Sequence, residues 1–247
     1  MKEGEQVEGR HAVLELLRAR RRKTHGVWLA DGQDRAPILA EIAELAEDQG
    51  VAVRHVGAAR LAADAHTSAP QGVLARADPV PTVALDDLLA GSDGIAPFLL
   101  GIEGVTDPRN LGGLLRTAVG AGVTGALFPR HRASPITPTV VKAAAGAVEV
   151  LPLSVVGGLP AALARARKAR LWVVGLDPGA PPIWDLDLAT EPLVPVVGAE
   201  GGALTRLTRD RCDALAGVPM TGPLESLNVG AAAAIALFDV ARRRKVP

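Results

Sequence analysis

From Pro97 onward the sequence alternates short, continuously apolar runs with helical stretches. The apolar runs cover residues 98–102, 125–128, 171–174 and 193–197, and the helical stretches cover residues 110–120, 139–145, 160–168 and 229–243. Strands that are apolar throughout and separated by helices are typical of a parallel sheet covered on both faces. We therefore expect an α/β fold that binds its ligands beyond the carboxyl ends of the strands.

A shorter α and β alternation precedes this region. It predicts helices at residues 9–17, 37–49 and 58–65, and strands at residues 27–29, 51–53 and 72–75. Turn-forming residues then interrupt the pattern at 78–81 and 91–94. These breaks predict a small domain over residues 1–78, a linker over 79–95 and a larger domain over 96–247.

Composition excludes several classes of protein. The 27 basic and 27 acidic residues cancel, so a nucleic-acid partner would be attracted by local patches such as the basic run 18–23. The single cysteine, Cys212, rules out an internal disulfide and a cysteine metal cluster, and the five histidines show no ligand spacing. Without a signal peptide or an apolar run of membrane length, the protein is expected in the cytoplasm, with no membrane partner.

Three segments place polar residues and glycines directly after apolar strands. In the first, Asp107-Pro108 makes a turn, Asn110 is suited to cap the helix that follows, and Arg116 lies nearly two turns along that helix. In the second, the strand at 193–197 runs into Gly198-Ala199-Glu200-Gly201-Gly202. Taken alone, the first segment favours an ordinary helix start with a solvated arginine. The second is explained equally well by a plain strand-to-loop turn with Glu200 as a surface carboxylate.

The third segment leads from Pro219-Met220 through Glu225-Ser226-Leu227-Asn228-Val229 into an alanine-rich helix. An ordinary helix cap would explain Ser226 or Asn228 in isolation. The three segments in this order are far more specific than any one of them. Together they resemble the three motifs of the SpoU (TrmH-type) RNA 2'-O-methyltransferases, a branch of the SPOUT superfamily.

The N-terminal region carries a second part of the same resemblance. Residues 9–13 (Gly-Arg-His-Ala-Val) and 69–73 (Ala-Pro-Gln-Gly-Val) are similar to the family's small substrate-binding domain, which is L30e-like, after ribosomal protein L30. The resemblance spans nearly the whole chain. It departs at Gly230, where family members often carry a second serine.

The resemblance implies a catalytic domain with a C-terminal deep trefoil knot, which pattern reasoning alone would not predict because knots are very rare. It implies a homodimer with its sites near the subunit interface, and S-adenosyl-L-methionine as the methyl donor, without a metal. The donor would contact backbone at Gly198, Ala199, Gly201, Met220 and Leu227. Arg116 would lie beside the 2'-hydroxyl and its phosphate, and four residues would orient Arg116 and the ribose: Asn110, Glu200, Ser226 and Asn228.

A separate N-terminal domain of this kind resembles the members that methylate a guanosine of 23S rRNA, so the expected partner is 23S rRNA or a ribosome assembly intermediate. Two alternatives stay open, a tRNA 2'-O-methyltransferase and a catalytically inactive RNA-binding relative. A third reading comes from Gly120 to Gly125, which match the G-x-G-x-x-G pattern of dinucleotide-binding oxidoreductases. Its context is unfavourable, because these glycines follow a predicted helix and precede a strand.

Overall fold

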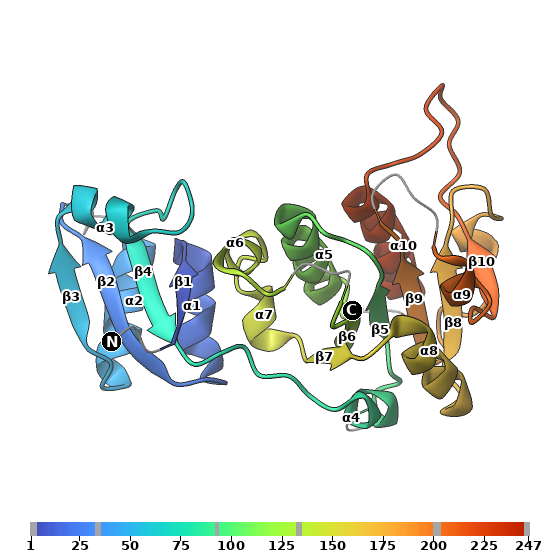
Figure 1. Ribbon diagram of the computed structural model, residues 1–247, viewed down its shortest axis with the longest axis horizontal. Helices are drawn as coiled ribbons and strands as arrows, with labels where there is room; N and C mark the ends of the chain where they lie inside the picture. The colour runs from blue at the N-terminus through green and yellow to red at the C-terminus, as the bar shows by residue number, and fades with distance from the viewer. Residues whose placement is uncertain (1–3, 33–35, 92–93, 132–134, 200–203, 245–247) are drawn as a thin grey trace. The chain divides into compact units, whose positions relative to one another are not determined.

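The computed structural model divides the chain into two compact units (Figure 1). It describes residues 4–32, 36–91, 94–131, 135–199 and 204–244. The first unit comprises Met1–Pro81 and Ile136–Val150, and the second comprises Thr82–Pro135 and Leu151–Pro247. The segment 136–150, which the sequence assigned to the larger domain, thus makes its contacts with the N-terminal residues.

The first unit is built on a mixed four-stranded sheet with the order β1-β4-β2-β3. Its strands are β1 (Glu5–Glu8), β2 (Thr24–Ala30), β3 (Val53–Val56) and β4 (Val73–Ala77). Only the β2–β3 pair is parallel. Alternate residues such as Val7, Val27 and Ala75 are fully buried, because one face of the sheet packs on α1 (Arg10–Ala19) and α2 (Pro37–Asp48).

The opposite face of this sheet is covered in part by α3 (Ala58–Asp64). Leu61 of α3 packs there on Ala30 and Leu74, with Trp28 and Val56 at the margin of the cluster. Two further helices, α6 (Pro138–Ala143) and α7 (Ala147–Val150), lie against β1 and α1. Between them the chain turns at Gly146, whose φ is +95° and where an added Cβ would lie 2.4 Å from the side chain of Glu15. Only glycine fits this close approach.

The second unit contains a six-stranded sheet in the order β10-β8-β9-β5-β6-β7. The strands are β5 (Leu99–Ile102), β6 (Gly125–Pro129), β7 (Leu153–Val156), β8 (Trp172–Leu176), β9 (Leu193–Val197) and β10 (Ala214–Ala216). Every neighbouring pair is parallel, which confirms the predicted parallel α/β sheet.

Helices cover both faces of this sheet. Val173, Val194 and Val196 pack on α4 (Leu85–Ala90) and α8 (Leu159–Lys168) on one side. The alternate residues Val174 and Pro195 face α10 (Val229–Arg243) on the other. There α10 packs beside α5 (Pro108–Gly120). Two short elements complete the unit, the 3-10 helix η1 (Ile183–Asp185) and α9 (Arg206–Arg209).

Arg244 links the end of α10 to the segments that precede β5 and β9. Its guanidinium donates to the carbonyl oxygens of Ala189 (2.6 Å), Ala96 (3.3 Å) and Glu191, and lies 4.6 Å from the centroid of the Phe98 ring. Burial lowers the pKa of Arg244 from its ordinary value. No helix in the described part of the chain has the length and apolar character needed to cross a membrane.

Candidate functional site

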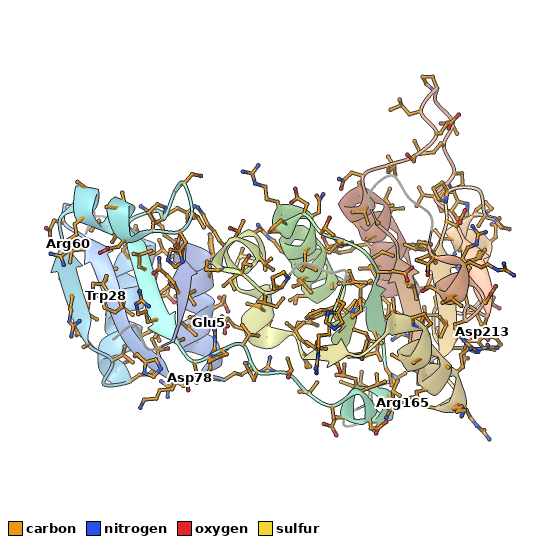
Figure 2. All side chains as sticks on the ribbon, in the orientation of Figure 1. Glu5, Trp28, Arg60, Asp78, Arg165 and Asp213 are labelled. Atoms are coloured by element: carbon orange, nitrogen blue, oxygen red, sulfur yellow. The ribbon has the colours of Figure 1, made fainter. Side chains whose placement is uncertain are left out.

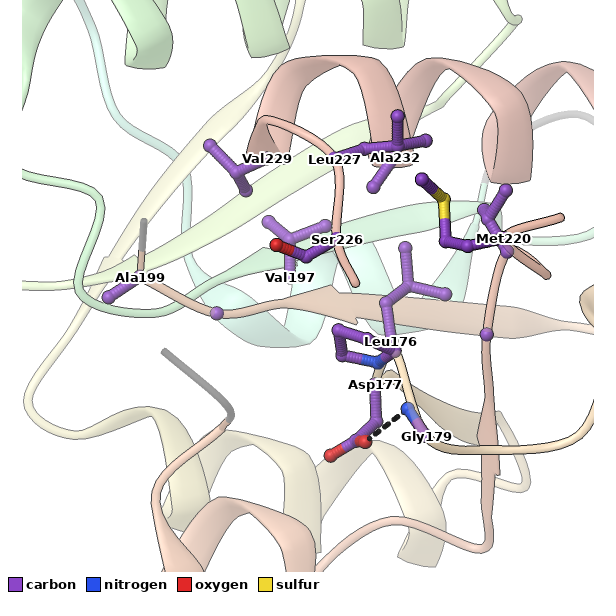
Figure 3. A pocket seen from close by; sticks show the side chains of 14 residues that line it. Leu176, Asp177, Gly179, Val197, Ala199, Met220, Ser226, Leu227, Val229 and Ala232 are labelled. Carbon is purple, nitrogen blue, oxygen red and sulfur yellow. Dashed lines mark hydrogen bonds between the residues drawn. The ribbon is translucent and has the colours of Figure 1, made fainter. Parts of the chain in front are cut away.

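A cavity of about 260 Å³ opens in the second unit where β8 and β9 end (Figure 3). Four segments line it: the end of β8 with its following loop, the end of β9, the loop after β10 and the entry of α10. The lining residues are Leu176, Asp177, Pro178, Gly179, Val197, Gly198, Ala199, Gly217, Val218, Met220, Ser226, Leu227, Val229 and Ala232. The cavity therefore lies at the carboxyl edge of a parallel sheet, where ligands of such folds bind.

Close backbone packing shapes one wall of the cavity. At Gly217, an added Cβ would lie 2.5 Å from the carbonyl oxygen of Asp177 and 2.9 Å from that of Ala180. These distances are too short for any side chain, so the loop after β8 and the loop after β10 approach one another only because residue 217 is glycine.

Asp177 is the carboxylate of this wall. Its Oδ1 accepts a hydrogen bond from the backbone N–H of Gly179 (3.1 Å), drawn as a dashed line in Figure 3. Its Oδ2 forms an ion pair with Arg209 (2.8 Å), and the side chain is 12% exposed. The carboxylate is thus held in one orientation at the edge of a mainly apolar cavity.

The entry of α10 forms the opposite wall. Asn228 is the N-cap, and its Oδ1 accepts a hydrogen bond from the backbone N–H of Gly230 (2.8 Å). This bond satisfies one of the donors that a helix start leaves unpaired. An added Cβ at Gly230 would lie 3.1 Å from the same oxygen. Ser226 and Leu227, just before the cap, line the cavity.

The structure brings five of the predicted site residues into this cavity: Gly198, Ala199, Met220, Ser226 and Leu227. Asn228 adjoins it as the cap of α10. Glu200 and Gly201 lie outside the described residues. The cavity-lining residues that the sequence did not predict come mainly from the loop after β8. There Pro178 and Gly179 follow Asp177, and this sequence indicates only a turn.

The structure corrects the predicted start of α5. Asn110 does not cap this helix. Asp107 does, because its Oδ1 accepts from the backbone N–H groups of Arg109 (2.6 Å) and Asn110 (3.2 Å). Asn110 is instead a residue of the first helical turn. Arg116 lies on the exposed side of α5, and neither residue is among those that line the cavity.

Sequence and structure comparisons agree on what this chain resembles. Residues 97–238 match the SpoU rRNA Methylase family, and residues 6–83 match the RNA 2'-O ribose methyltransferase substrate binding family. The 23S rRNA (guanosine-2'-O-)-methyltransferase RlmB of Pseudomonas putida is 39% identical, with 100% of this chain and 99% of the relative covered. The RlmB of Pseudomonas aeruginosa is 40% identical, with 99% and 98% covered.

Among solved structures, the SpoU methyltransferase AviRb from Streptomyces viridochromogenes, in complex with AdoMet, superposes with a TM-score of 0.79. The match covers 98% of this chain and 90% of AviRb, at 22% sequence identity, and it supports the fold. Fold and cavity define an α/β protein with a small-ligand site at the strand ends. The two family matches identify the class of α/β protein, and they confirm the resemblance found in the sequence. The chain belongs to the SpoU rRNA methylase family.

Proposed function

We propose that this protein transfers a methyl group from S-adenosyl-L-methionine to a ribose 2'-hydroxyl of RNA. The observation that carries the proposal is the cavity itself. Four of the five residues that the sequence motifs assign to the methyl donor, Gly198, Ala199, Met220 and Leu227, line one cavity at the strand ends. They come from two segments that residues 200–219 separate in the chain, so their convergence supports a shared ligand.

The composition of the cavity suits the methyl donor. Leu176, Val197, Leu227 and Val229 offer apolar contact to a planar base. The Asp177 carboxylate at the edge is an acceptor for ribose hydroxyls. The volume of about 260 Å³ is near the lower limit of the ~300–1,000 Å³ typical of ligand pockets. When bound, the donor would supply a methyl group on a positively charged sulfur that is already activated for transfer.

The protein's own task is to align the ribose with that methyl group and to help remove the hydroxyl proton. We assign Arg116 to the 2'-hydroxyl and its neighbouring phosphate. A guanidinium stays protonated, so its role is to stabilise negative charge on the oxygen and to hold the phosphate rather than to act as a simple base. Asn110, Glu200, Ser226 and Asn228 would orient these groups.

We propose that the enzyme is a homodimer whose site is shared between subunits. Leu227, Ile235 and Phe238, at the entry of α10 and on the helix itself, are 37%, 39% and 50% exposed. Apolar side chains of this size on one helix are typical of a subunit interface. Arg116, exposed and outside the lining of its own chain's cavity, would then act at the cavity of the other subunit.

Two finer features of the fold belong to the same proposal. We infer a deep trefoil knot in the second unit, supported by the return of α10 from the edge strand β10 to pack on β9 and α5. We also assign the N-terminal domain to the L30e-like class, supported by its mixed α/β sheet and by the substrate-binding match over residues 6–83.

For the substrate we propose a guanosine of 23S rRNA, in the free RNA or in a ribosome assembly intermediate. Support comes from relatives that carry this activity in their names and match almost the whole chain. Action on ribosomal RNA would place the enzyme in the cytoplasm. A tRNA 2'-O-methyltransferase and an inactive RNA-binding relative are the alternatives that the experiment must separate.

The test combines calorimetry with mapping of modified nucleotides. Titration with S-adenosyl-L-methionine should release heat at one site per chain, whereas an inactive RNA binder should show none. The purified protein, given the donor and unmodified 23S rRNA or tRNA, should then add a 2'-O-methyl group to one guanosine of 23S rRNA. Methylation of tRNA alone would overturn the substrate assignment, and absence of donor binding would overturn the enzymatic function.

A further inference from the structure

One face of the sheet in the first unit is only partly covered. Strand register places Trp28 of β2 between Arg54 of β3 and Leu74 of β4, with all three on this face. Along β2, an added Cβ at Gly26 would lie 3.1 Å from the Trp28 ring, so the indole extends over the glycine. Figure 2 labels Trp28 on the sheet. Because residue 26 has no side chain, the Trp28 ring lies along the strand over it.

Trp28 lines a cavity of about 420 Å³ on this face. The cavity is bounded by Gln6, Trp28, Val56, Leu61, Ala63, Asp64, Ala65, His66, Leu74, Ala75 and Arg76. The guanidinium of Arg54 lies 5.6 Å from the centroid of the indole, within the range of a cation–π contact. An aromatic ring beside arginines is the arrangement on which unpaired nucleotides stack.

Arg76 is held at the centre of this face. One of its N–H groups donates to Oε1 of Gln6 (3.2 Å). Gln6 is itself 5% exposed and is fixed by donating to Glu8 (2.8 Å) and to the carbonyl oxygen of Asp64 (2.9 Å). A buried amide held by these bonds orients the guanidinium without neutralising it, so its charge stays available to an anion.

A second cavity, of about 250 Å³, adjoins the first. It is lined by Gly4, Glu5, Gln6, His66, Arg76, Ile136, Pro138 and Val141. Gln6, His66 and Arg76 line both cavities, so Arg76 lies where the two adjoin, and we call the two cavities together the groove. The groove runs from the aromatic end at Trp28 to the surface of α6.

The charges of the groove favour an anionic occupant. Its two carboxylates already face cations, since Asp64 lies 4.0 Å from Arg60 and Glu5 lies 3.4 Å from Arg22. Arg54 and Arg76 have no carboxylate partner among the described residues. A single-stranded nucleic acid matches the groove, because its bases are flat and can stack on the Trp28 indole and its phosphates can pair with Arg76.

We propose that this groove binds an unpaired segment of the RNA substrate, with one base against Trp28 and the adjacent phosphate at Arg76. The inference rests on the proposed function for its choice of RNA, and it adds a specific place of contact remote in sequence from the catalytic motifs. Because any base has a flat face, the groove selects single-stranded RNA rather than a particular sequence.

Tryptophan fluorescence tests this contact directly. The chain has three tryptophans, so changing Trp172 and Trp184 to phenylalanine leaves Trp28 as the only reporter. A single-stranded RNA about eight nucleotides long should quench Trp28. The same strand without its bases, and double-stranded RNA, should not. Absence of quenching at saturation would overturn the proposal.

Variants of the full-length enzyme give the second arm. Trp28→Leu keeps an apolar side chain against Leu61 but loses the aromatic face, and should weaken single-stranded RNA binding about tenfold. Trp28→Phe should restore most of it. Trp172→Leu, which removes a tryptophan of the second unit that is 43% exposed, is the matched control. Arg76→Gln should reduce the slope of log affinity against log salt by about one, the change expected when one phosphate contact is lost.

Thermal unfolding and the heat of donor binding verify that each variant is folded. If Trp28→Leu binds RNA as tightly as the control, the proposal is wrong. It is also wrong if RNA binding is unchanged and the sedimentation coefficient shifts, because the groove would then bind a second copy of the chain. None of these readouts requires methyl transfer. Quenching without methylation would refute the proposed function alone, whereas methylation without quenching would refute this inference alone.

Discussion

The guanidinium of Arg22 and the carboxylate of Glu149 form an ion pair in which the side chains are 2% and 1% exposed. Nε of Arg22 donates to Oε2 of Glu149 at 3.0 Å, and the same guanidinium donates to the carbonyl oxygen of Asp78 at 2.8 Å. The two residues are 127 positions apart. A side chain from the middle of the methylase region thus completes the interior of the N-terminal unit.

Removing one partner of this pair should be costly. Glu149→Ala leaves the buried guanidinium with the more exposed Glu5, 3.4 Å away, in place of its buried counter-charge, and we expect the free energy of unfolding to fall by about 3 kcal/mol in urea titrations. Glu41→Ala is the control, because Glu41 pairs with Arg18 on the surface and should change stability by less than about 1 kcal/mol. A small effect of Glu149→Ala, similar to that of the control, would contradict the buried geometry.

Glu8 makes the stability of the first unit sensitive to acid. Burial alone would raise its pKa, but hydrogen bonds from the Thr67 hydroxyl, the His66 backbone N–H and other donors outweigh burial, and the pKa of Glu8 is lowered from 4.5. A depressed pKa contributes stability that is present above 4.5 and is lost as the pH falls through the folded-state value.

The Glu8→Gln variant should therefore be less stable than the wild type near neutral pH, and the difference should shrink on acidification. Chemical unfolding followed at a series of pH values measures both effects. Parallel curves for the two proteins down to the acid limit would contradict the role of the Glu8 charge.

The single thiol should be unreactive in the folded protein. Burial, followed by the negative charges of Asp213 and Glu103, raises the pKa of Cys212 to about 11, and the thiol donates to the carbonyl oxygen of Thr208 (3.3 Å). Because the thiolate is the nucleophile, only about one molecule in a thousand is reactive near pH 8. Colorimetric titration should show slow labelling in buffer and rapid labelling in urea; equal rates would contradict it.

Gly217→Ala should disturb the cavity wall. The added methyl group would meet the carbonyl oxygens of Asp177 and Ala180, and moving the two loops apart should cost about 1–3 kcal/mol of stability. Affinity for S-adenosyl-L-methionine, measured by calorimetry, should fall about tenfold or more. Gly222→Ala, where an added Cβ has no neighbour within 4 Å, is the control. Unchanged affinity of Gly217→Ala would place the donor elsewhere.

A shared active site makes a distinctive prediction for mixed dimers. Arg116→Ala and Asn228→Ala should each be inactive alone. If Arg116 of one subunit serves the cavity of the other, a dimer of one variant with the other contains one intact site, and should recover about half of the wild-type activity. An inactive mixed dimer would mean that each chain uses its own Arg116.

Much of the second unit is predictable because its central strands are apolar on both faces and alternate with helices. The predicted strands at 125–128 and 193–197 correspond to β6 and β9 almost residue for residue. Several shorter elements were missed, and α4 and β7 show why. The helix α4 falls within the predicted linker, since six residues are too few to show a helical period, although Leu85, Leu88 and Leu89 are buried. The strand β7 was missed because it has only four residues and directly follows Pro152, and a proline is typical of a turn rather than of a strand.

The candidate site was predictable where glycines and a helix start adjoin a strand, as at Gly198 and Ser226. It was not predictable where a side chain acquires its place through folding alone. Asp177 resembles any turn residue until Arg209 and Gly179 fix its carboxylate. The cap of α5 was wrongly assigned to Asn110 because Asp107, three residues earlier, is equally suited to cap and nothing local separates the two.

The position of α6 and α7 limits how this enzyme can be recombined with its relatives. The chain passes between the two units at 81/82, 135/136 and 150/151. A chimera that exchanges only the N-terminal 81 residues would keep the host's residue at position 149 opposite the donor's residue at position 22. Grafts intended to transplant RNA preference from one homologue to another should therefore carry residues 136–150 along with the N-terminal segment.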